Sequence, residues 1–291
     1  MFRGIALGFL TYLFFSSTDA TTKELAFRMS VFEKAFFITI FGIFPMFWMK
    51  PRGMRWRVAM RVTRPGLLAI RACCGLSASL LGLYAFTALP LAEAYALIFL
   101  IPFFVTLLSK LVLKEHVPWQ RWATVAVGLV GVLLVVRPGF KELALGHLAA
   151  IGVAFASSIT IIILRTLAPT EKPVALLGWV CIAVISFNGI AMLPSFTWPS
   201  TYDLGLTAMA GVFSGLGSVC LITAMRLAPA SRIGATQYSQ IIWAVLLGWI
   251  FFHERPDDLG MIGVGFVVLS GILAFLTGKE APKPSPASVE T

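Results

Sequence analysis

The stretch LVLKEHVPWQRW (residues 111–122) places a short charged segment between two long apolar runs. A second stretch, WIFFHERPDDLG (residues 249–260), also ends an apolar run with a glutamate between basic residues, followed soon by a proline. Placing Glu115 on Glu254 relates the two parts of the chain by an offset of 139 residues. We interpret this similarity as an internal repeat.

Further positions match at the same offset. Pro90 falls on Pro229, and Ser79 falls on Ser218. With a shift of two residues, the pair Ser16 and Ser17 matches the pair Ser157 and Ser158. The chain therefore reads as two copies of one unit.

The composition predicts a membrane protein. Of 291 residues, 58% are hydrophobic and 12% are charged, about half the charged share of a typical soluble domain. About 20 apolar residues are needed for a helix to cross a bilayer. Ten such runs are predicted, at 4–20, 33–49, 66–88, 92–112, 119–136, 145–165, 172–193, 204–226, 233–252 and 258–277. We predict an all-α polytopic membrane protein, and we reject a cleaved signal peptide for the first run because the repeat requires that helix.

Ten helices in two copies make a unit of five helices, at 1–138 and 139–278. Because five is odd, the second copy enters the membrane from the opposite side, which gives an inverted repeat suited to alternating access. The Pro- and Ser-rich segment 279–291 is predicted to be a disordered cytoplasmic tail.

The basic residues predict the orientation of the chain. If the N-terminus is cytoplasmic, 17 Lys and Arg residues lie on the inner side and 6 on the outer side. Both termini are therefore expected in the cytoplasm, in a bacterial inner membrane. Six basic residues lie within the loop 50–64, so the net charge of +10 follows the positive-inside rule and does not indicate a nucleic-acid partner.

Several motifs resemble those of a known family. The pattern AL–P–AEA–AL around Pro90, the proline of FLIPFF (Pro102), the L–KE segment before residue 116 and a Gly-rich fifth helix are similar to the EamA-type family of the drug/metabolite transporter superfamily. The resemblance implies a ten-helix secondary transporter of small metabolites with a central cavity. The second copy departs from the pattern at Ile241, which stands where the first copy has Pro102.

Ionisable residues are rare within the apolar runs, and their cost in lipid makes each one a candidate site. Asp19 lies four residues before Lys23, the spacing of an ion pair on a helix surface. The alternative is that Ser16, Ser17 and Asp19 line the mouth of the cavity. Arg71 lies near the inner end of its run, where its side chain is expected to reach the membrane interface.

Three other carboxylates lie close to helix starts. Glu93 falls in the first turn of the fourth helix, where it suits the helix dipole or faces the cavity. Glu115 and Glu254 each precede a helix, so we expect them to cap it. A gating ion pair is the alternative for both.

Polar and aromatic side chains complete the predicted substrate site. The candidates are Ser79, Tyr84, Tyr95, Phe99, Ser157, Trp179, Ser218, Gln237, Tyr238, Gln240 and Trp243. Hydrogen bonds and packing between helices are the structural alternative for these residues. Pro102 is expected to bend its helix, and Gly128, Gly131, Gly263 and Gly265 are expected to permit close helix packing or to form the seam of a homodimer.

Other functional classes are disfavoured. The sequence has no phosphate-binding GxxxxGK[ST] motif, and its four cysteines show no metal-ligand spacing. We therefore expect no ATP-driven pump, no cofactor and no metal. The three histidines (His116, His147 and His253) are predicted at helix ends or in loops and no nucleophile has an adjacent base, so we also expect no enzymatic activity. The expected partners are a small solute and membrane lipid. A channel or a membrane scaffold is the alternative.

Overall fold

The computed structural model describes residues 2–45, 53–112, 114, 117–137, 144–167, 171–227 and 236–277. In this part of the chain all regular structure is helical. The first half contains α1 (Phe2–Glu24), α2 (Val31–Ile43), α3 (Trp56–Ala59), α4 (Pro65–Ala88), α5 (Leu91–Ile98), α6 (Ile101–Leu111) and α7 (Trp119–Val136). The second half contains α8 (Leu145–Leu167), α9 (Pro173–Ala191), η2 (Leu193–Ser195), α10 (Thr201–Leu227), α12 (Ser239–Phe252) and α13 (Asp258–Thr277).

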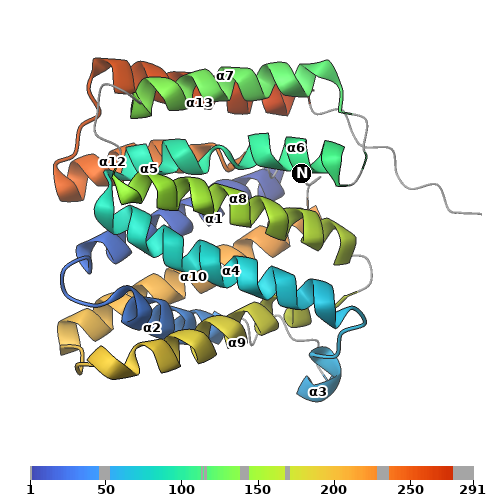
Figure 1. Cartoon of the computed structure of the whole chain (residues 1–291), viewed down its shortest axis with the longest axis vertical. Helices are drawn as coiled ribbons and strands as arrows, with labels where there is room; N and C mark the ends of the chain where they lie inside the picture. The colour runs from blue at the N-terminus through green and yellow to red at the C-terminus, as the bar shows by residue number, and fades with distance from the viewer. Residues whose placement is uncertain are drawn as a thin grey trace, which may run out of the picture.

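The long helices lie side by side as one bundle (Figure 1). Among the described residues, five segments are long and apolar enough to cross a membrane: Pro65–Ala88, Leu91–Leu111, Leu145–Leu164, Val174–Ala191 and Thr201–Leu221. Trp122–Val136, Ser239–Phe252 and Asp258–Leu273 are shorter apolar helices. The predicted all-helical membrane fold is confirmed at this level, and the count of ten spans stays a prediction.

The run predicted at 92–112 is interrupted in the structure. α5 ends at Ile98 and α6 begins at Ile101, with Pro102 in the first turn of α6. Proline has no backbone N–H, so it cannot donate to the carbonyl four residues earlier, which belongs to Ile98. The bend expected at Pro102 therefore takes the form of a break between two shorter helices.

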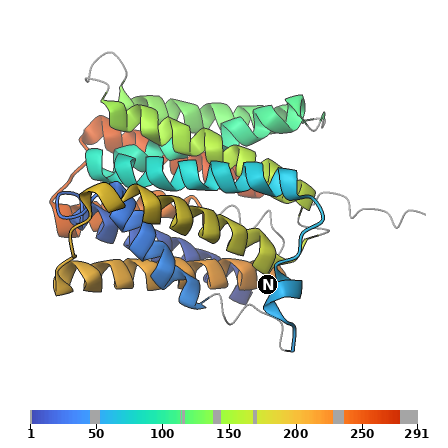
Figure 2. The same ribbon diagram turned by 60° about the horizontal axis from the view of Figure 1, so that its bottom comes forward.

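The two halves contact each other along most of their length. α1 packs against α10 and α12, while α8 packs against α4, α5 and α6. α2 lies against α9 and α10, and Figure 2 brings these three helices forward. The largest group of buried apolar side chains comes from α5, α7, α8, α12 and α13. The core is thus shared between the halves.

α7 and α13 form a close contact through three of the predicted glycines. A Cβ added to Gly131 would lie 2.7 Å from the carbonyl oxygen of Gly263. A Cβ on Gly128 would lie 2.9 Å from the hydroxyl of Ser270, which donates to the carbonyl of Thr124. These pairings run in opposite directions, so α7 and α13 are antiparallel. Gly265 has no atom within 4 Å of an added Cβ and takes no part in the contact.

Polar contacts gather at the two ends of the bundle. At one end, which we call the Lys23 end, Lys23 pairs with Glu254 and Arg137 pairs with Asp257. At the opposite end, which we call the Glu171 end, Glu171 accepts hydrogen bonds from Thr63. Five of the six basic residues predicted on the outer side are described. Lys23, Arg28, Arg137 and Arg255 lie near the Lys23 end, and Lys34 is buried in the first turn of α2.

Candidate functional site

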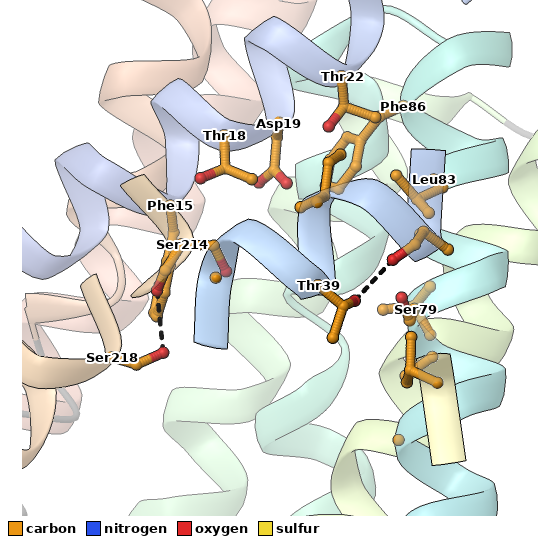
Figure 3. Close-up of a pocket in the computed structure, with 18 of the residues that line it drawn as sticks. Phe15, Thr18, Asp19, Thr22, Thr39, Ser79, Leu83, Phe86, Ser214 and Ser218 are labelled. Atoms are coloured by element: carbon orange, nitrogen blue, oxygen red, sulfur yellow. Dashed lines mark hydrogen bonds between the residues drawn. The ribbon is translucent and has the colours of Figure 1, made fainter. Parts of the chain in front are cut away.

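A central cavity of about 420 Å³ lies inside the bundle. Its wall is formed mainly by α1, α2, α4, α9 and α10, and α5 and α12 contribute Tyr95 and Gln240. Figure 3 shows side chains from α1, α2, α4 and α10 turned toward this space. Most of the wall is apolar, with hydroxyl groups from Thr18, Thr22, Thr39, Ser79, Ser214 and Ser218.

The most polar part of the wall is a chain of three residues, Asp19, Tyr95 and Gln240. The Tyr95 hydroxyl donates to Asp19 Oδ2, and the Gln240 amide donates to the Tyr95 oxygen at 3.2 Å. Tyr95 is 1% exposed, so its hydroxyl depends on these partners for hydrogen bonding. The chain joins α1, α5 and α12, which come from both halves of the sequence.

The predicted ion pair between Asp19 and Lys23 is wrong. Although four residues apart, the two side chains turn to different partners: Asp19 to Tyr95 of α5, and Lys23 to Glu254 in the connection between α12 and α13. Lys23 Nζ contacts Glu254 Oε1 at 2.5 Å and donates to the carbonyl of Leu89 at 2.7 Å. Asp19 is left to line the cavity, which was the alternative from the sequence.

The prediction that Glu254 caps the helix that follows it is also wrong. Asp257 accepts from the backbone N–H of Gly260 at the start of α13. Glu254 instead accepts from the N–H of Leu91, the first residue of α5, at 3.1 Å. Glu254 therefore caps a helix of the first half and also pairs with Lys23. Glu115 lies outside the described residues.

Glu93 lies away from the central cavity. Its Oε1 is 3.1 Å from Nε2 of His147, and both side chains are buried. Glu93 lines a second cavity of about 380 Å³ at the Lys23 end, together with Glu254 and Arg255. Its position in the first turn of α5 fits the predicted interaction with the helix dipole. The cavity that Glu93 lines is the second one and not the central one.

The structure brings only part of the predicted site together. Asp19, Ser79, Tyr95, Ser218 and Gln240 line the central cavity. Ser16 lies next to them, since its hydroxyl is 3.4 Å from the carbonyl of Gln240. Ser17 donates to the carbonyl of Leu13, and Ser157 and Gln237 are half-buried outside the cavity wall.

Of the aromatic candidates, Tyr95 lines the central cavity and the others lie outside its wall. Phe99 stacks on Tyr238, with ring centroids 5.3 Å apart and planes 11° apart, so this pair joins α5 to the start of α12. Trp243 has an indole N–H without a hydrogen-bond partner among the described residues. Tyr84 and Trp179 lie on the surface, 40% and 41% exposed, and the Trp179 indole donates to the carbonyl of Met60.

Some cavity residues were missed in the sequence. Thr18 and Thr22 of α1, with Phe15 and Asp19, lie at the i, i+3, i+4 and i+7 positions of one helical face. That spacing could have identified the face. Thr39 and Cys181 stand in apolar surroundings, and nothing in the local pattern distinguishes them.

Comparison with known protein families divides the chain near the boundary between the two predicted repeat units. A family model described as the EamA-like transporter family matches residues 2–137 and 144–276. The pseudopaline exporter CntI of Pseudomonas aeruginosa is 29% identical over 95% of this chain and 97% of its own length. The S-adenosylmethionine uptake transporter of Rickettsia prowazekii is 22% identical over 96% of this chain and 94% of its own.

A riboflavin transporter of Vibrio cholerae is 27% identical over 67% of this chain, and the match spans 65% of that transporter. A crystal structure of similar fold aligns with a TM-score of 0.70 and 19% identity, covering 94% of this chain and 96% of the other. At that identity the likeness concerns the fold alone. The fold, the family match and the apolar helices agree on an integral membrane protein.

Proposed function

Because the chain belongs to the EamA-like transporter family, we propose that it is a secondary transporter that carries a small organic metabolite through its central cavity. The observation that carries this proposal is the chain Asp19–Tyr95–Gln240, which joins helices of both halves at the cavity wall. A solute that competes for these hydrogen bonds would change how the halves are held together. Alternating access requires such a link between binding and helix packing.

The cavity suggests the chemistry of the solute. Its volume falls in the range of roughly 300–1,000 Å³ that is typical of small-molecule sites. Apolar walls with a few hydroxyl groups and one carboxylate suit a partly polar molecule that offers N–H or O–H donors to Asp19. The relatives named for riboflavin, S-adenosylmethionine and pseudopaline concern solutes of this general kind.

The proposed mechanism uses two inverted units, residues 1–138 and 139–278, with both termini in the cytoplasm of a cell with an inner or plasma membrane. The antiparallel contact of α7 with α13 and the reciprocal packing of α1 and α8 support this arrangement. Rocking of one unit against the other would open the cavity to each side in turn. In the state described, the pair of Lys23 and Glu254 holds α1 to the α12–α13 connection.

The test begins with a search for a ligand. Purified protein is screened against metabolites by thermal shift, because a ligand that binds the folded state raises its melting temperature. Uptake of the ligand found is then measured in proteoliposomes. We expect Asp19→Asn to lower uptake at least about tenfold, the effect of weakening a hydrogen bond to a charged group. Gln240→Ala loses a hydrogen bond to the neutral Tyr95 hydroxyl and should lower uptake by less.

Tyr84→Ala is the matched control, because Tyr84 is exposed and lies outside the cavity. Each variant must keep the melting temperature of the parent protein without ligand. Equal uptake by the Asp19→Asn variant and the parent would count against the site. Single-channel currents in a planar bilayer would indicate that the protein is a channel and not a carrier.

A further inference from the structure

Arg71 is a buried charged residue that has no role in the proposed cavity. It lies in the second turn of α4 and is 6% exposed, although an arginine so near a helix end can normally reach the interface. In the structure the side chain is buried. Its side chain turns into the bundle and one guanidinium nitrogen donates to the carbonyl of Leu176 in α9.

The guanidinium is only partly satisfied there. Its Nε has no hydrogen-bond partner, and in the described part of the chain no carboxylate forms an ion pair with it. Leu68, one turn earlier on α4, packs in a cluster with Ile163, Leu167 and Leu176. The apolar surroundings and the missing counter-ion make this a costly place for a charge.

Arg71 does not line the central cavity itself, but it lies one helical turn from a residue that does. Gly75, one turn further along α4, lines the cavity and faces Val180 of α9. Cys181, the next residue, lines the cavity as well and lies close enough to Arg71 to interact with it electrostatically. The cavity wall thus contains a carboxylate, Asp19, and an arginine lies one helical turn beyond the wall, toward the Glu171 end.

We infer that Arg71 is a binding residue for the anionic group, a carboxylate or a phosphate, of the transported solute. The inference rests on the proposed transport function and adds the charge of the substrate to it. A guanidinium offers five N–H donors in a geometry that matches both groups, and the Nε donor of Arg71 is buried without a partner. A solute that moves from the cavity toward the Glu171 end meets Arg71 behind Cys181, and its anion supplies the missing counter-ion.

Cys181 provides a probe beside the guanidinium that requires no knowledge of the substrate. Cys73, Cys74 and Cys220 are replaced by serine, which leaves Cys181 as the only thiol. Its reaction rates with an anionic reagent, methanethiosulfonate ethylsulfonate, and a cationic one, methanethiosulfonate ethyltrimethylammonium, are then compared. We expect the ratio of anionic to cationic rates to fall about tenfold in Arg71→Met and to persist in Arg71→Lys.

Lys172→Gln is the control, since it removes an exposed positive charge at the same end of the bundle. An unchanged ratio in Arg71→Met would overturn the inference. Failure of both reagents to reach Cys181 would do the same, because it would exclude solutes from this part of the bundle. The reaction of Cys181 is also measured with acetate or inorganic phosphate present. The anion that slows this reaction is the one that Arg71 prefers, and no slowing by either anion would count against a binding role.

The melting temperature separates binding from a structural role. If Arg71 serves only to hold α4 to α9, Arg71→Met should lower the melting temperature. If Arg71 is kept for a solute, removing an unpaired buried charge should leave the melting temperature unchanged or raise it. These measurements do not depend on uptake, so a failure of transport in proteoliposomes would be distinguishable from a failure of the Arg71 assignment.

Discussion

Lys23 and Glu254 form a contact that joins several elements at the Lys23 end. Lys23 belongs to α1, Glu254 follows α12, and both also bind the backbone at the junction of α4 and α5, through Leu89 and Leu91. Their side chains are 12% and 26% exposed. A partly buried pair of this kind depends on both members, because either one alone is a desolvated charge.

We therefore predict that Glu254→Gln destabilises the protein by roughly 1–3 kcal/mol, since Lys23 loses its counter-ion and the N–H of Leu91 loses a charged acceptor. The melting temperature of purified protein in detergent measures the effect. Glu24→Gln, at an exposed position one residue after Lys23, is the control and should change nothing. A double variant with Lys23→Met should be less than additive.

Glu171 gives a pH-dependent contribution at the opposite end. The hydroxyl and backbone N–H of Thr63 donate to its Oε1, each at 2.6 Å, and the N–H of Arg64 also donates. These hydrogen bonds, led by that of the Thr63 hydroxyl, hold the pKa of Glu171 below its ordinary value. A carboxylate with a lowered pKa in the folded state stabilises the fold above its unfolded pKa.

That stability is lost as the pH falls through the folded-state pKa. We predict that the melting temperature of the parent protein declines as the pH falls from about 5 to about 3, a range that includes the ordinary pKa of a glutamate side chain. Glu171→Gln should lower the melting temperature at pH 7 and flatten the decline. Parallel curves for the two proteins would show that Glu171 contributes no pH dependence.

At the residue scale, the sequence could identify which groups are unusual but not which groups they meet. Asp19 and Glu93 stand out because charges are rare in the apolar runs. Their partners, Tyr95 and His147, lie 76 and 54 residues away. Helical spacing reports neighbours within one turn, and for Asp19 that local rule predicted Lys23, whereas tertiary packing provided a different partner.

At the element scale, the contact between α7 and α13 depends on the absence of side chains. Gly131 and Gly263 bring two backbones together, and a Cβ on either would fall 2.7 Å from the carbonyl oxygen of the other. Gly265 is two residues from Gly263 on a different face, with open space around it.

We predict that Gly263→Val lowers the melting temperature strongly, by the roughly 1–3 kcal/mol of an overpacked core or more. Gly265→Val is the matched control, with the same substitution on the same helix, and should have little effect. Comparable losses in both variants would indicate a cost of valine in the helix itself and not a steric clash. If Gly263→Val were tolerated, the close contact would not exist in the membrane.

Helix positions were the most predictable feature, because long apolar runs determine them. The sequence also placed a bend at Pro102, and the structure has a break there. It did not separate Gly263 from Gly265, since both are small and both lie in the same run. Facing positions on another helix decide which glycine is needed, and a single sequence does not contain that information.

At the scale of the whole molecule, the cavity has a carboxylate in its wall and an arginine one helical turn beyond it. Asp19 and Tyr95 lie toward the Lys23 end, while Arg71 lies behind Cys181 toward the Glu171 end. Arg71 and Gly82, which lines the cavity beside Val153, are 11 residues apart on α4, a rise of about 16 Å along the helix. A small solute would therefore meet the two charges in succession as it crosses.

The order in which a solute meets Asp19 and Arg71 depends on the direction in which each half crosses the membrane. We predict that the Lys23 end faces outward and the Glu171 end faces the cytoplasm, following the distribution of basic residues. Lys114 and Arg255 are both exposed and follow α6 and α12, the corresponding helices of the two halves. Single cysteines at these positions, in a background without other cysteines, should react with a membrane-impermeant maleimide from opposite sides of intact cells.

Lys114→Cys should be labelled only after the membrane is opened, and Arg255→Cys should be labelled in intact cells. Lys172→Cys serves as the control, because Lys172 lies at the Glu171 end, bonded to the carbonyl of Val58, and should behave like Lys114→Cys. Labelling of positions 114 and 255 from the same side would mean that the two halves cross in the same direction. The cavity would then lack the two-sided access on which both the carrier mechanism and the inward position of Arg71 depend.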